Sequence, residues 1–108
     1  NRAIARQFSG DIVGALEDMN CAIEQERHTA SYYYVRGNIY ILLENYFAAL
    51  ADYDAAIQLD AAFAEAYFNR GIAYLMLNNR ASACYDMENA IRLGYKDGEE
   101  KLMYLCNF

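Results

Sequence analysis

Apolar residues recur at helical intervals along this chain, in blocks that polar or glycine-containing breaks separate. One block runs from Tyr33 to Leu43 and the next from Tyr46 to Leu59, each with apolar positions three or four apart. The breaks fall at Gly10 and Asp11, Glu44 and Asn45, and Asn78 and Asn79, which are residue types that tolerate a left-handed conformation or cap a following helix. The pattern predicts pairs of helices, and no strand pattern competes with it.

The helix pairs repeat with a period of 34 residues. Nine residues recur at that spacing: Tyr33, Arg36, Gly37, Tyr40, Ala49, Asp52, Ala56, Ile57 and Leu59 return as Tyr67, Arg70, Gly71, Tyr74, Ala83, Asp86, Ala90, Ile91 and Leu93. A third, partial copy contains Arg2, Ala15, Asp18, Ala22 and Ile23. A fixed period of this length indicates a solenoid, in which each unit buries its apolar face against the next.

This frame divides the chain into one domain with four segments. Residues 1–29 form a first repeat without its beginning, and residues 30–63 and 64–97 form two complete repeats. We therefore expect the chain to be part of a longer polypeptide. Residues 98–108 leave the frame and predict a final helix that caps the last repeat or docks on another protein or a second copy of the chain.

The repeat resembles the tetratricopeptide repeat (TPR), whose pattern combines a large aromatic residue, Gly and Tyr with Ala and an aromatic residue in the second helix. The positions that carry the resemblance are Tyr33, Gly37, Tyr40, Ala49, Tyr53 and Ala56, and then Tyr67, Gly71, Tyr74, Ala83, Met87 and Ala90. The resemblance implies an all-α fold, a right-handed superhelical solenoid of antiparallel helix pairs. The closing Pro of the family is replaced by Arg27, Ala61 and Tyr95, and Arg36 and Arg70 stand where the family has Leu.

Some repeated positions predict structural contacts. Gly37 and Gly71 should allow helices to approach closely, and the repeated Ala positions should leave room for aromatic rings. The repeated Arg and Asp lie at equal distances from the hairpin turn. We therefore expect an ion pair in each unit, which joins Arg2 to Asp18, Arg36 to Asp52 and Arg70 to Asp86.

Charge and hydropathy exclude two classes of partner. The net charge is −6 and no cluster of Lys and Arg is present, which argues against nucleic acid. The longest apolar stretch, near 39–43, is too short to cross a membrane.

Residues that could support catalysis or bind a metal are few. Cys21, Cys84 and Cys106 are expected to be small buried or half-buried thiols, since they share no frame position and form no C-x-x-C pair. His28 is expected on the surface, and Asp52 and Asp54 as ion-paired or solvated carboxylates. We expect no enzyme, metal or cofactor.

In the resembling family the first helix of each repeat lines the concave face, where a peptide or partner helix binds. This implies ten candidate contact residues, with Tyr34 and Phe68 as anchors: Tyr34, Val35, Asn38, Ile41, Leu42, Phe68, Asn69, Ile72, Leu75 and Met76. Ile41, Leu42, Leu75 and Met76 could equally be packed core. Asn38 and Asn69 could offer amide groups to the backbone of a ligand.

Some relatives use this face to hold the acidic tail of a heat-shock chaperone with Lys, Arg and Asn. Here Tyr34, Glu99 and Met103 occupy positions that should be basic, so we do not expect that partner. The sequence favours a non-enzymatic protein-interaction scaffold. Two alternatives stay open: a self-association module that forms a homodimer, and an accessory segment of a larger enzyme or assembly.

Overall fold

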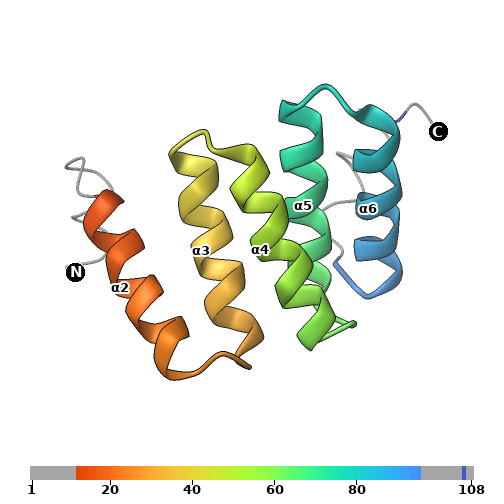
Figure 1. Cartoon of the computed structure of the whole chain (residues 1–108). Helices are drawn as coiled ribbons and strands as arrows, with labels where there is room; N and C mark the ends of the chain where they lie inside the picture. The colour runs from red at the N-terminus through yellow and green to blue at the C-terminus, as the bar shows by residue number, and fades with distance from the viewer. Residues whose placement is uncertain (1–11, 96–105, 107–108) are drawn as a thin grey trace.

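The computed structural model describes residues 12–95 and 106, and over this part of the chain it contains five α-helices and no strand. The helices are α2 (Ile12–Gln25), α3 (Ala30–Leu42), α4 (Tyr46–Leu59), α5 (Ala64–Met76) and α6 (Arg80–Arg92). They stand side by side in chain order, and the two termini lie at opposite ends of the row (Figure 1). The all-α repeat architecture expected from the sequence is confirmed.

The turns inside the two hairpins have the same construction. Glu44 and Asn78 adopt positive φ angles of 61° and 64° and end α3 and α5. The next residue in each turn caps the following helix: the side-chain oxygen of Asn45 accepts from the backbone N–H of Ala48, and that of Asn79 accepts from Ser82. These are two of the breaks that the sequence predicts, and the third, at Gly10 and Asp11, lies outside the described residues.

Each helix packs against its neighbours in the chain, and α3 also contacts α5. Repeated Ala residues are completely buried where the helices meet, namely Ala49, Ala56, Ala83 and Ala90. A Cβ atom on Gly37 would lie 2.7 Å from Cε1 of Tyr53, and one on Gly71 would lie 3.0 Å from the carbonyl oxygen of Ala83. Glycine at these two positions therefore allows the helices of a hairpin to approach closely.

Helices α3 and α4 lie within the segment 30–63, and α5 and α6 lie within 64–97. The final helix expected over 98–108 lies outside the described residues, apart from Cys106.

Candidate functional site

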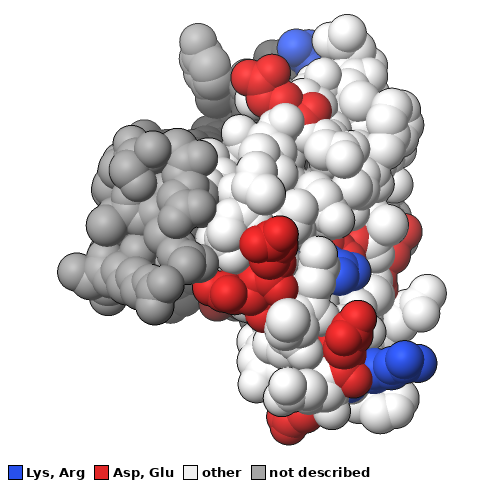
Figure 2. Space-filling model, turned by 60° about the vertical axis from the view of Figure 1, so that its left-hand side comes forward, with Lys and Arg blue, Asp and Glu red and all other residues white. Residues whose placement is uncertain are grey.

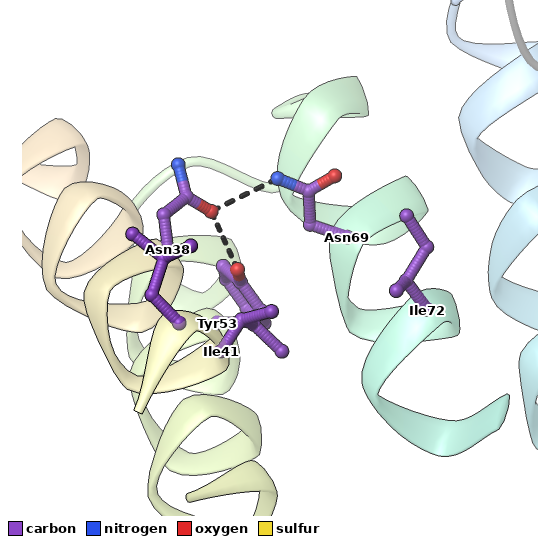
Figure 3. Close-up of a pocket in the computed structure, with 6 residues that line it drawn as sticks. Asn38, Ile41, Tyr53, Asn69 and Ile72 are labelled. Carbon is purple, nitrogen blue, oxygen red and sulfur yellow. Dashed lines mark hydrogen bonds between the residues drawn. The ribbon is translucent and has the colours of Figure 1, made fainter. Parts of the chain in front are cut away.

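A hollow of about 350 Å³ opens between α3 and α5, the first helices of the two complete hairpins. We call it the α3–α5 groove and define it by its six lining residues: Asn38, Ile41, Leu42, Tyr53, Asn69 and Ile72. Three of them come from α3, two from α5, and Tyr53 comes from α4 (Figure 3). Its volume lies at the lower end of the range of ligand-binding pockets.

Hydrogen bonds join the polar side chains of the groove into one network. The Tyr53 hydroxyl donates to Oδ1 of Asn38, and Nδ2 of Asn69 donates to the same oxygen over 2.9 Å (Figure 3). Nδ2 of Asn69 also donates to the Tyr34 hydroxyl over 3.2 Å. Burial raises the pKa of the Tyr53 hydroxyl above its ordinary value, so this group remains a donor at neutral pH.

The groove brings together five of the ten residues expected to contact a ligand: Asn38, Ile41, Leu42, Asn69 and Ile72. The ring of Tyr34 is half-buried, 4.9 Å from the ring of Phe63 and 6.1 Å from that of Tyr53. Its contribution to the groove is the hydroxyl that supports Asn69.

Three other candidates do not line the α3–α5 groove. Val35 and Met76 are exposed elsewhere on α3 and α5. Leu75 packs against the core cluster around Phe68 and Met87.

Phe68 is placed differently from the sequence-based expectation. Only 3% of it is exposed, and it forms a core cluster with Met87 and Ala90. Its ring centroid lies 4.7 Å from that of Tyr95. The prediction of a surface anchor was wrong, because Tyr95 and α6 enclose the ring, whereas Tyr34 at the same frame position is only half-buried.

Tyr53 is the lining residue that the sequence analysis did not propose. It lies on a second helix, and the resemblance had assigned ligand contacts to first helices alone. Its repeated aromatic position was the available signal, and that position was interpreted as packing.

The structure forms both of the expected ion pairs that fall within the described residues. Nε and Nη2 of Arg36 donate to the two carboxylate oxygens of Asp52 over 2.9 and 2.8 Å. Arg70 binds Asp86 in the same bidentate way, with both distances 2.8 Å. These hydrogen bonds raise the pKa of each guanidinium. The third expected pair includes Arg2, which lies outside the described residues.

Each arginine also reaches the second helix of the preceding hairpin. Nη1 of Arg36 donates to Oδ1 of Asn20 on α2 over 2.8 Å, and Nη1 of Arg70 donates to Oδ1 of Asp54 on α4 over 2.7 Å. Asn20 and Asp54 are themselves 34 residues apart. One guanidinium therefore joins the two helices of its own hairpin to the hairpin before it. Asp54 is thus part of an ion pair.

The cysteines differ from the expectation. Cys84 on α6 forms a disulfide with Cys106, 22 residues later. Cys21 is free and exposed. The prediction of buried or half-buried thiols was wrong, because the disulfide depends on the chain beyond the repeat frame returning to α6, and the spacing of the cysteines carries no sign of that.

Residues with catalytic or metal-binding potential do not converge in the described part of the chain. Over residues 12–95 and 106, no group of three or more His, Cys, Asp or Glu side chains could hold a metal ion. His28 is exposed. Among the described helices, none has the length and apolar character that spanning a bilayer requires.

Helix pairs that repeat at a fixed period and pack in chain order define an α-helical repeat domain. Residues 37–78 match the TPR repeat family. A search of the curated proteins found no match. Together with the structural likenesses that follow, the match identifies the chain as a tetratricopeptide repeat protein.

Solved TPR structures have the same fold as this chain. The second TPR domain of human RPAP3, solved with the HSP70 peptide SGPTIEEVD, matches with a TM-score of 0.84 at 25% identity, over 96% of this chain and 88% of that one. The Yersinia enterocolitica secretion chaperone SycD, solved with a peptide of the translocator YopD, matches with a TM-score of 0.85 at 15% identity, over 95% and 82%. MamA matches with a TM-score of 0.84 at 20% identity over 93% of this chain, which spans 60% of the MamA chain.

Proposed function

We propose that this chain is a non-enzymatic protein-interaction scaffold that binds a peptide or a partner helix in the α3–α5 groove. The observation that carries the proposal is the groove itself, where apolar walls enclose a hydrogen-bonded pair of amides. A site with apolar walls and a few oriented polar groups is typical of binding sites. Two structural neighbours were solved with peptides of other proteins, which supports the same class of function.

Apolar surface in the groove supplies the binding free energy. Leu42 is 51% exposed although it lines the hollow. A ligand that covers Leu42 and the neighbouring Ile41 and Ile72 removes apolar area from water at about 25 cal/mol for each Å². Equilibrium binding of this kind needs no reacting group.

A matched pair of substitutions tests the proposal. Leu42→Glu introduces a charge into the groove, and Phe47→Glu introduces the same charge on α4 at a residue that is 74% exposed and does not line the groove. Both replace an exposed apolar side chain, so both variants should fold. A partner captured with the wild-type chain, and then purified, should bind the Leu42 variant at least tenfold more weakly in calorimetric titration and the Phe47 variant as tightly as wild type. Equal affinity of the two variants would move the binding site away from the groove.

A further inference from the structure

The geometry points to one kind of ligand for the α3–α5 groove, and we infer that it is an extended, uncharged, internal segment of a partner polypeptide. An aliphatic side chain of that segment fills the hollow, and one of its peptide groups binds Asn38 and Asn69. This inference rests on the proposed function and specifies the partner's chemistry.

The hydrogen-bond network fixes which way each amide points. Oδ1 of Asn38 accepts from both the Tyr53 hydroxyl and Nδ2 of Asn69, so its Nδ2 faces the other way. Nδ2 of Asn69 uses its two N–H groups on Asn38 and the Tyr34 hydroxyl, which leaves its Oδ1 turned outward. Figure 3 shows the Asn38 nitrogen and the Asn69 oxygen pointing away from the bonds between them.

Two groups of opposite polarity are therefore available to a ligand. Among the described residues, Nδ2 of Asn38 and Oδ1 of Asn69 take part in no hydrogen bond. One is a donor and the other an acceptor, which matches the C=O and N–H of a peptide group. A helix satisfies these groups internally and could offer side chains alone, so an extended segment fits better.

A carboxylate fits this pair poorly. It could accept from Asn38, but its second oxygen would face the Asn69 oxygen, and two acceptors repel each other. Removing a charge from water without a partner is costly. A C-terminal or acidic tail would meet that cost here.

The nearby cations cannot compensate for an acidic ligand. Arg36 and Arg70 are the Lys or Arg residues of α3 and α5, and each guanidinium makes three hydrogen bonds to side chains outside the groove. The lining includes no Lys, Arg, Asp or Glu. The net charge of −6 also disfavours the approach of an anion. On the face shown in Figure 2, acidic side chains cover more of the surface than basic ones.

Peptides of defined chemistry test the inference on the full-length chain labelled with ¹⁵N. One probe is an array of acetylated, amidated heptapeptides made of uncharged residues with Leu, Ile or Val at the centre. The other is SGPTIEEVD with a free carboxylate, the peptide in the solved RPAP3 complex. We expect neutral peptides from the array to shift the side-chain amide signals of Asn38 and Asn69, and the acidic peptide to bind at least tenfold more weakly.

Two changes probe the peptide-group contact directly. Asn38→Asp keeps the oxygen that accepts from Tyr53 and Asn69 and replaces the outward donor with an acceptor, so it should weaken the best neutral peptide at least tenfold. Gln58→Glu adds the same charge on an exposed part of α4 outside the groove and should have no effect. N-methylation of the peptide at each position in turn should cost at least tenfold at one central position, where the N–H that binds Asn69 is lost.

The outcomes separate the inference from the proposed function. The inference is overturned if SGPTIEEVD binds the groove as tightly as the neutral peptides. It is also overturned if Asn38→Asp and every N-methylation leave the affinity within twofold. In both cases binding in the groove would stand. If peptides of neither class shift any signal from a residue that lines the groove, the inference and the proposed function fail together.

Discussion

Replacing Asp86 with Asn should destabilise the fold far more than replacing Asp54 with Asn, although both carboxylates bind the guanidinium of Arg70. The Asp86 side chain is 2% exposed and accepts two hydrogen bonds of 2.8 Å from Arg70. The Asp54 side chain is 52% exposed and accepts one of 2.7 Å. The two substitutions are chemically identical, so burial and bidentate geometry are what differ between them.

The expected magnitudes follow from that difference. Breaking a buried ion pair by removing one charge costs about 3–5 kcal/mol. Because 17% of the Arg70 side chain remains exposed to water, we expect the lower end, about 3 kcal/mol, for Asp86→Asn. An exposed pair contributes about 0–1 kcal/mol, which is the expected cost of Asp54→Asn.

Urea unfolding followed by circular dichroism at 222 nm measures both changes. With a slope of about 1–3 kcal/mol per M urea, Asp86→Asn should lower the midpoint by roughly 1–3 M. The same two substitutions in an Arg70→Met background should no longer differ, which assigns the effect to the pair. Costs within 0.5 kcal/mol of each other in the wild-type background would refute the reasoning.

Three further predictions concern the packing, the disulfide and the buried hydroxyl. Gly37→Ala should lower the unfolding free energy by about 1–3 kcal/mol, because its Cβ would lie 2.7 Å from the completely buried ring of Tyr53; an unchanged melting temperature would contradict this. Reduction of the Cys84–Cys106 disulfide should cost about 3 kcal/mol by freeing a loop of 22 residues, whereas Cys21→Ser should change nothing, and equal melting temperatures with and without reductant would disprove the first expectation. Burial raises the pKa of Tyr53 above its ordinary value of about 10, so the neutral form stabilises the folded state below pH 10 and this stability is lost as the pH rises further. Unfolding titrations should show a steeper loss above pH 10 in the wild type than in Tyr53→Phe, and parallel curves would exclude the linkage.

The parts of the structure that the sequence predicted are those that depend on local chemistry or on the repeat frame. Glu44 and Asn45 end one helix and begin the next because few other residue types suit a positive φ followed by a cap. The contact between Arg36 and Asp52 follows from their equal distances to that turn. Both inferences need only the period and elementary helix geometry.

The parts that the sequence could not predict depend on contacts that differ between repeats. Tyr34 and Phe68 share a frame position, yet Phe68 is buried against Tyr95 while Tyr34 supports the groove with its hydroxyl. The frame treats the two as equivalent, and only the neighbours of each ring distinguish them. The same holds for Cys84, whose disulfide partner lies outside the repeat.

The most direct test of the account is to locate the bound partner relative to the α3–α5 groove. Intermolecular nuclear Overhauser effects can be measured between a purified partner peptide and the methyl groups of the chain. The account predicts contacts from the peptide to the methyl groups of Ile41 and Ile72, which face each other across the groove. Contacts confined to residues outside it, such as Phe47 or Tyr85, would contradict the central claim.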